Sequence, residues 1–362
     1  MKNKIAIASA FIAASSFSSA EIAINEFLSL EGFIDMSYVY TDAEATAAGD
    51  TASASDNSYQ IDQVEIAFLF DFDPVTAQID IQFEDIANSS DFEDGSDGNT
   101  VEQAFFTYHF SDGGGAITAG RFASFLGFEA FEPTGLYQYS FAYDIPGLAD
   151  VAVIPFYHQG VKFTYENDTS FFGVSVVDSI YDNDDDRLGG PGESTYGIEA
   201  AGSIDLGNGF AWFLGGGFED GDADDGDSFV LNTYVTFETG AWIFAGEISY
   251  GDYEPGFALV GALEEIDAID FGSDEEVIQA LIMANFAYSD QGSITGRFSW
   301  SDHEADSSIG DVEADFIKFT AAHGWAFTDN LFLVTEVNFV DGDVAGIDYE
   351  ALQGALELIF AF

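Results

Sequence analysis

Apolar and polar residues alternate along this chain with a period of two, in segments of about ten residues that are separated by turns. In residues 63–72, Val64 and every second residue after it are apolar, whereas Gln63, Glu65 and Asp71 lie in the opposite phase. Successive side chains of a β-strand point to opposite faces of the sheet. The alternation therefore predicts strands with one apolar face and one polar face.

Similar segments follow one another over almost the whole chain. They lie near residues 28–40, 63–72, 75–84, 104–110, 117, 162–165, 172–176, 196–204, 210–218, 229–237, 242–250, 278–288, 294–300, 317–321, 331–339 and 356–362. Repeated amphipathic strands of this length are typical of a transmembrane β-barrel. We predict an all-β fold, a single up-and-down antiparallel barrel of about 16 strands, with 14 or 18 as alternatives. A soluble β-sandwich would divide into domains of about 100 to 150 residues, and no linker marks such a boundary.

The connections between these segments alternate in length. Tight turns are predicted at residues 73–74, 112–115, 167–168, 207–208, 239–240, 289–292 and 328–329. Long polar loops are predicted near residues 42–58, 88–100, 124–156, 180–194, 219–228, 251–275, 302–311 and 341–349. An even number of strands with short periplasmic turns and long acidic extracellular loops is the plan of outer-membrane barrels. Aromatic residues next to the turns, including Phe72, Trp242 and Tyr288, predict an interfacial girdle.

The first twenty residues have the pattern of a secretory signal peptide. Lys2 and Lys4 precede an apolar stretch that ends near Ile12, and small residues lead to Ala20. We therefore expect a signal peptide at residues 1–20 and one barrel domain at residues 21–362. No later run of eighteen uninterrupted apolar residues occurs, so no membrane-spanning helix is expected.

Composition excludes several classes of function. The formal net charge is −59, which makes nucleic acid an implausible partner and concentrates cations near the surface. The chain has no cysteine, so disulfides and thiol chemistry are excluded. None of the four histidines stands in a known catalytic motif, and we expect no enzymatic activity and no cofactor.

Two local motifs resemble a known family. The last strand, with Leu356, Leu358, Phe360 and Phe362 in one phase, looks like the terminal strand that the outer-membrane assembly machinery recognises. Residues 102–133 contain Ala119-Gly120-Arg121-Phe122 and Leu126-Gly127-Phe128-Glu129, and this stretch resembles the OmpL-like β-barrel porins. The resemblance implies an outer-membrane pore of undefined solute, with lipid and lipopolysaccharide as its surroundings.

The longest loop, residues 124–156, is rich in aromatic residues and low in charge, unlike the other loops. A sixteen-stranded barrel is wide enough to leave an aqueous channel. We therefore expect this loop to fold inward and narrow the channel. The alternative is that it packs on the outer rim or against a neighbouring subunit.

Strand parity predicts which charged residues face the channel. The candidate lining and constriction residues are the basic Arg121, Lys162, Arg297 and Lys318 and the acidic Glu65, Asp80, Glu84, Glu199, Glu247, Glu336, Glu129 and Glu132. Acidic groups outnumber basic groups, so the sequence predicts passive diffusion of small cationic or neutral solutes. The basic groups could instead simply pair with wall carboxylates. A structural or adhesive barrel with a plugged lumen and acidic, cation-binding loops is the alternative function.

Two weaker expectations concern ions and assembly. Asp220, Asp222 and Asp224 alternate as calcium ligands do, but the following glycine is one position late and no glutamate closes the loop. These residues are weak metal candidates. A homotrimer is expected only because sixteen-stranded porins often associate in this way.

Overall fold

The computed structural model describes residues 21–83, 100–111, 113–181, 196–220, 227–253, 271–307 and 312–362. The predicted signal peptide, Glu84, Asp222 and Asp224 lie outside these residues. Within them, no helix is long and apolar enough to cross a membrane.

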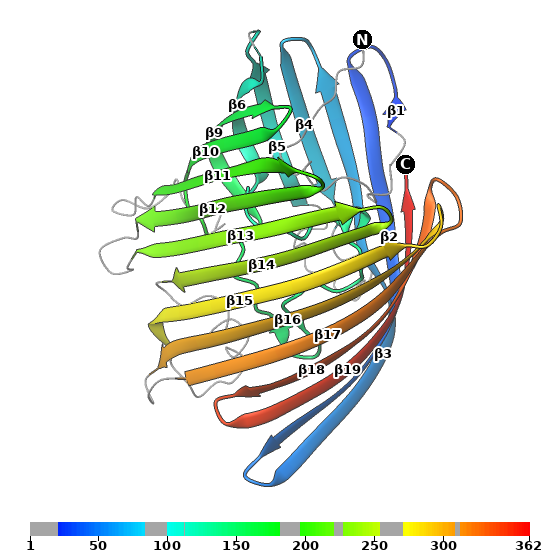
Figure 1. Ribbon diagram of the computed structural model, residues 1–362, viewed down its shortest axis with the longest axis vertical. Coiled ribbons are helices and arrows are strands. Elements are labelled where there is room, and N and C mark those ends of the chain that lie inside the picture. The colour runs from blue at the N-terminus through cyan, green and yellow to red at the C-terminus, as the bar shows by residue number, and fades with distance from the viewer. Residues whose placement is uncertain are drawn as a thin grey trace, which may run out of the picture.

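Sixteen antiparallel strands close into a barrel (Figure 1). They are β2 (Leu28–Ala47), β3 (Asp50–Asp71), β4 (Val75–Gln82), β5 (Thr100–His109), β6 (Gly115–Ala123), β9 (Tyr157–Asn167), β10 (Ser170–Val177), β11 (Tyr196–Gly207), β12 (Phe210–Asp220), β13 (Ser228–Thr239), β14 (Trp242–Tyr253), β15 (Phe271–Ala287), β16 (Gly292–Ser307), β17 (Val312–Ala326), β18 (Leu331–Val344) and β19 (Ile347–Ala361). The last strand, β19, pairs with β2 and completes the ring. A short strand, β1 (Ile22–Ala23), adds to the start of β2. The predicted fold class and strand number are confirmed.

The outer face of the barrel is apolar. Val161, Val176 and Ile282 expose 50%, 57% and 62% of their surface, although each belongs to a regular strand. Their neighbours in the opposite phase, such as Lys162 in β9, point into the barrel. An apolar exterior of this extent is unfavourable in water and suits hydrocarbon.

Aromatic side chains gather beside the tight turns, as the sequence predicts. Phe72, Trp242 and Tyr288 are all exposed. Trp242 stacks on Phe244 and on Phe286 of the next strand, with ring centroids 5.5 and 4.5 Å apart. The rings lie at the end of the barrel that carries the tight turns, in the position of an interfacial girdle.

The two chain ends lie at one end of the barrel, and long hairpins project from the opposite end (Figure 1). Three predicted long loops are wrong, because residues 42–58 and 341–349 are mostly strand and residues 302–307 of the loop predicted at 302–311 belong to β16. In the β2–β3 hairpin only Ala48 and Gly49 form the turn, and Ala345 and Gly346 do the same between β18 and β19. All four residues have positive φ, as the tight turns that fit twisted hairpins require. The polar composition of these segments suggested loops, but backbone pairing needs no apolar face.

The segment between β6 and β9 lies inside the barrel. It contains a short 3-10 helix, η1 (Pro133–Gly135), and a two-stranded piece formed by β7 (Asp144–Ile145) and β8 (Ala149–Asp150). We call residues 124–156 the inner loop. Its inward fold agrees with the prediction from its aromatic composition.

Candidate functional site

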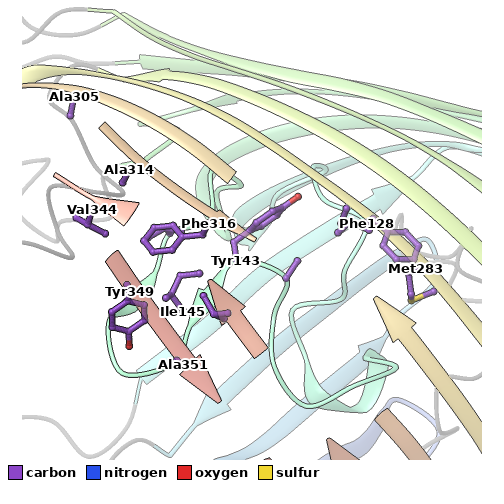
Figure 2. Packing of buried hydrophobic residues seen from close by; sticks show 14 of the residues in the cluster. Phe128, Tyr143, Ile145, Met283, Ala305, Ala314, Phe316, Val344, Tyr349 and Ala351 are labelled. Atoms are coloured by element: carbon purple, nitrogen blue, oxygen red, sulfur yellow. The ribbon is translucent and has the colours of Figure 1, made fainter. Parts of the chain in front are cut away.

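The inner loop is held against the inner wall by apolar packing. Phe128, Tyr143 and Ile145 of the loop are buried in one cluster with Phe316 of β17 and Tyr349 of β19 (Figure 2). A second cluster joins the start and the end of the loop to the walls of β10 to β15. Burial of large apolar side chains on this scale makes the docked loop a fixed part of the barrel interior.

Wall side chains also bind the first turn of the inner loop. Glu199 of β11 accepts hydrogen bonds from the hydroxyl of Ser124 and, at 3.0 Å, from the backbone N–H of Phe125. Glu247 of β14 accepts one from the backbone N–H of Phe128 at 2.8 Å. These carboxylates therefore provide acceptors for loop N–H groups that have been removed from water.

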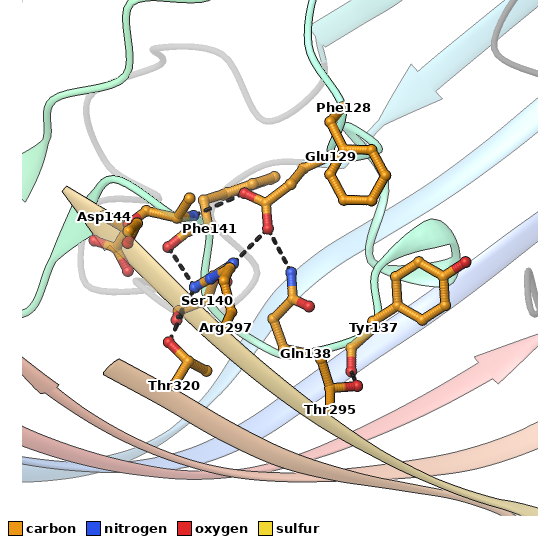
Figure 3. A network of polar contacts seen from close by, with 12 residues as sticks. Phe128, Glu129, Tyr137, Gln138, Ser140, Phe141, Asp144, Thr295, Arg297 and Thr320 are labelled. Atoms are coloured by element: carbon orange, nitrogen blue, oxygen red, sulfur yellow. Dashed lines mark hydrogen bonds and ion pairs between the residues drawn. The ribbon is translucent and has the colours of Figure 1, made fainter. Parts of the chain in front are cut away.

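The middle of the inner loop is bound by groups of both charges. The backbone N–H of Tyr139 and the hydroxyl of Ser140 donate to Glu336 of β18 at 2.8 and 2.6 Å. Arg297 of β16 donates to the carbonyl oxygens of Ser140 and Phe141 at 2.8 and 3.0 Å and pairs with Glu129 of the loop (Figure 3). Three of these contacts bind the loop through its backbone, and the other two use the side chains of Ser140 and Glu129.

Lys318 of β17 continues this binding toward the far end of the loop. Its ammonium group donates to the carbonyl oxygens of Phe141 and Asp144 at 2.8 and 2.6 Å. Beyond it, Gln279 of β15 accepts the N–H of Val153 at 2.9 Å. The inner loop thus reaches across the wall from β11 to β18.

The structure brings the predicted basic residues to the inner loop rather than to open solvent. Arg297 and Lys318 are only 3% and 1% exposed. Lys162 lies 4.3 Å from the ring centre of Phe122 in β6 and 5.2 Å from that of Phe125 at the start of the loop. The alternative was that these basic groups merely pair with wall carboxylates. Arg297 and Lys318 instead bind loop carbonyl groups, and Lys162 contacts aromatic rings.

Arg121 lies near the end of β6, next to Gly120, which has a φ of 133°. Its Nε donates to the backbone carbonyl of Glu102 at 2.9 Å, and its guanidinium lies 5.6 Å from the ring centre of Tyr157. The pairing of β5 with β6 continues in register through Gly120, which opposes Phe105.

Acidic groups gather on the opposite part of the wall, on β3 to β5. Glu65 and Asp80 are buried, and Asp80 accepts hydrogen bonds from Gln78 and Gln103 at 2.8 and 2.7 Å. Glu132 of the inner loop accepts a hydrogen bond from Gln63 at 2.9 Å, so the loop meets this wall as well.

Two further acidic residues on this wall were missed by strand parity. The register of β2 and β3 shifts at Asp62, and that of β4 and β5 shifts at Glu102. Each shift inserts one extra residue, and both carboxylates point inward, where Asp62 accepts from Tyr139 at 3.3 Å and Glu102 from Tyr157 at 2.7 Å. Bulges re-aim side chains in this way, and nothing in the alternation signals them.

Asp35 of β2 and Glu357 of β19 were missed for a different reason. Both are buried on the inner wall, at 3% and 2% exposure. Each lies between exposed apolar neighbours, such as Leu356 and Leu358, so the alternation of these strands does carry the signal.

Burial changes the protonation of loop carboxyls. Burial and the nearby Glu102 raise the pKa of Glu132 to about 8. Burial, together with the charge of Asp144, raises the pKa of Asp150 to about 6. Glu132 therefore binds a proton near neutral pH when the inner loop is docked. Of the weak calcium candidates, only Asp220 lies within the described residues, at the end of β12.

The family profile described as "Putative beta-barrel porin-2, OmpL-like" matches residues 28–362. The chain belongs to this family of outer-membrane β-barrel porins. The OmpL-like resemblance predicted from residues 102–133 is thereby confirmed, as is an outer-membrane location. No curated protein gives a significant sequence match.

Solved outer-membrane porins share the fold at low sequence identity. The channel DcaP of Acinetobacter baumannii superposes with a TM-score of 0.60 at 14% identity, covering 92% of this chain and 97% of that one. OmpF of Salmonella typhi, solved with daunomycin, gives a TM-score of 0.60 at 15% identity over 95% and 100% of the chains. An anion-selective porin from Comamonas acidovorans gives 0.58 at 13% identity over 92% and 99%. That porin is described as anion-selective, so the shared fold by itself gives no support to a cation preference in this chain.

Proposed function

We propose that this porin-like barrel forms a water-filled channel for passive diffusion of small cationic or neutral solutes, with the inner loop as its constriction. One observation carries the proposal. Arg297 and Lys318 are covered by the loop, whereas the side of the lumen formed by β3 to β5 carries Asp62 and other acidic side chains that form no ion pair within the described residues. Carboxylates along a channel favour cations.

Reversal potentials across a planar bilayer in a potassium chloride gradient test the selectivity. We expect the sign of a cation-preferring channel. Asp62→Asn removes a negative charge from this side of the lumen and should reduce the preference. Asp42→Asn removes the same charge from the exposed part of β2 and should leave it unchanged. An anion-preferring channel contradicts the proposal, and a folded barrel that passes no ions favours the plugged structural role.

We further propose that residues 1–20 direct export and that the tight turns face the periplasm. Because the chain has no cysteine, single substitutions report the orientation. Ser53→Cys, near the tip of the β2–β3 hairpin, should react with a membrane-impermeant maleimide on intact cells. Asp168→Cys, in a tight turn, should react only after the outer membrane is opened. The reverse pattern would invert the orientation.

We also propose a homotrimer. Shared architecture supports this assembly, since OmpT of Vibrio cholerae has the same fold with a TM-score of 0.54 at 10% identity and is described in a trimer form. Native mass spectrometry from mild detergent should give three times the mass of one chain. A single-chain mass at all protein concentrations contradicts the trimer.

A further inference from the structure

Three carboxylates from separate parts of the chain meet where the inner loop touches the wall of β3 and β5. One ligand oxygen from each of Glu65, Glu102 and Glu132 lies within 4.8 Å of the other two. No ion pair within the described parts of the chain joins any of them to a basic side chain. Arg121 is bonded to the backbone carbonyl of Glu102 and not to its carboxylate.

Glu102 carries a second, separate sign that a ligand is missing from this contact. The residue is only 9% exposed, and its Oε1 accepts a hydrogen bond from Tyr157 at 2.7 Å. Its Oε2 is fully buried and has no hydrogen-bond partner. A buried carboxylate oxygen without a donor is costly, and such oxygens are normally paired or bound to a metal ion. The bulge in β5 is what turns this oxygen inward.

The oxygens are close enough for one ion to contact all three. Calcium binds oxygen ligands at about 2.3–2.6 Å, so two ligands of one calcium ion stand at most about 4.6–5.2 Å apart, and the three ligand oxygens lie within 4.8 Å of one another. Calcium also accepts several carboxylates as direct ligands. Magnesium requires shorter distances of about 2.0–2.1 Å and tends to keep its water. Gln63 donates to Glu132 and Glu65 at 2.9 and 3.3 Å and so orients two of the three ligands.

We propose that Glu65, Glu102 and Glu132 form a binding site for a calcium-sized divalent cation that ties the inner loop to the wall. The site is distinct from the weak candidate at Asp220, and it does not depend on the selectivity of the channel. A bound divalent ion would counter the negative charge of the carboxylates and supply the partner that Oε2 of Glu102 lacks.

Isothermal titration calorimetry of the full barrel in detergent, with calcium chloride in 150 mM sodium chloride as an approximately physiological background, tests the site. We expect one saturable site with a Kd of about 10⁻⁴–10⁻³ M. Glu102→Gln should weaken it about tenfold or more, because the affinity of oxygen sites follows their charged ligands. Glu44→Gln removes the same charge from the exposed β2–β3 hairpin and should leave the site intact. Magnesium chloride should bind more weakly.

Glu132→Gln provides a variant whose effect is separable from barrel folding, since Glu132 belongs to the inner loop and to no strand. It should lose the calcium site while the barrel still folds. Equal calcium binding by Glu102→Gln, Glu132→Gln and Glu44→Gln overturns the site in favour of diffuse binding to acidic loops. The absence of saturable binding in the unchanged protein also overturns it, in favour of protons shared among the carboxylates. Neither result depends on whether the channel conducts.

Discussion

At the scale of single residues, charged side chains of the inner wall serve as hydrogen-bonding partners of a loop. Glu199, Glu247 and Glu336 accept loop N–H groups, and Arg297 and Lys318 donate to loop carbonyls. An inner loop without secondary structure over most of its length leaves many backbone groups unpaired, and each must find a partner once it is buried. Charged side chains of the wall provide these partners, which explains why so many ionisable residues are buried here.

Arg297→Met is expected to loosen the inner loop. The substitution removes the donors to Ser140 and Phe141 and leaves Glu129 without its buried counter-charge. Removing one partner of a buried pair costs about 3–5 kcal/mol. Limited proteolysis of the folded barrel should then cut within residues 124–156 faster. Arg297→Lys is the control, because it keeps the charge but cannot bind two carbonyls with one planar group. Its rate of proteolysis should lie between those of the unchanged protein and Arg297→Met. Unchanged proteolysis in Arg297→Met contradicts this role.

Loop docking is also expected to depend on pH through Glu132. Its pKa is raised to about 8 in the docked loop, so between its ordinary value and pH 8 the docked state binds more protons than the released state. Docking is therefore most favourable at acidic pH and weakens as the pH rises toward 8. Current fluctuations of single channels in the presence of a chelator should increase from pH 5 to pH 9. Glu132→Gln should flatten this dependence; an equally steep response would assign it to another group.

At the scale of elements, the inner loop and the two long hairpins behave in opposite ways. The inner loop carries large aromatic side chains that pack on the wall, whereas the outer parts of β2 and β3 carry small polar residues that remain exposed. Apolar loop residues are drawn inward because burial removes them from water. The hairpins stay extended because neighbouring strands pair along their length: β2 pairs with β3 on one side and with β19 on the other.

Shortening the inner loop is expected to widen the channel. Replacing residues 130–150 with a short Gly-Ser linker removes the contacts to Glu336, Arg297 and Lys318 and should raise single-channel conductance severalfold. It should also lower thermal stability, since buried wall residues such as Phe316 lose their apolar cover. Removing residues 44–53 from the β2–β3 hairpin is the matched deletion and should leave conductance unchanged. Equal conductance of both deletions would sink the constriction role.

At the scale of the whole molecule, the barrel has an apolar exterior, although the chain is strongly acidic with a net charge of −59. The few described basic side chains of the inner wall are bound to the loop or to aromatic rings. We attribute the proposed cation preference to the long-range field of the remaining carboxylates. Such a field is screened by salt, since the Debye length falls from about 10 Å at 0.1 M to about 3 Å at 1 M.

The proposed cation preference is accordingly expected to fall as the salt concentration rises. The measurement is the reversal potential at a fixed concentration ratio, repeated at mean salt concentrations near 0.1 M and 1 M. The permeability ratio of potassium to chloride should move toward one at the higher concentration. A ratio that does not change with salt would assign selectivity to direct contacts at the constriction and not to the field of the chain.

The sequence by itself determined the barrel. Alternating side chains fix which face of each strand meets hydrocarbon, as at Val161 and Lys162, and sixteen such strands with no apolar partner can only close on themselves. The same alternation placed Glu65, Asp80, Glu199, Glu247 and Glu336 on the inner wall.

Only the tertiary structure decided what those inner groups contact. Whether Arg297 faces water or the backbone of Ser140 depends on where a loop more than 150 residues earlier in the chain is packed. The inward turn of Asp62 and Glu102 depends on bulges set by pairing with neighbouring strands. A period of two is a local property of the backbone, whereas loop docking and strand register are set by contacts between distant segments.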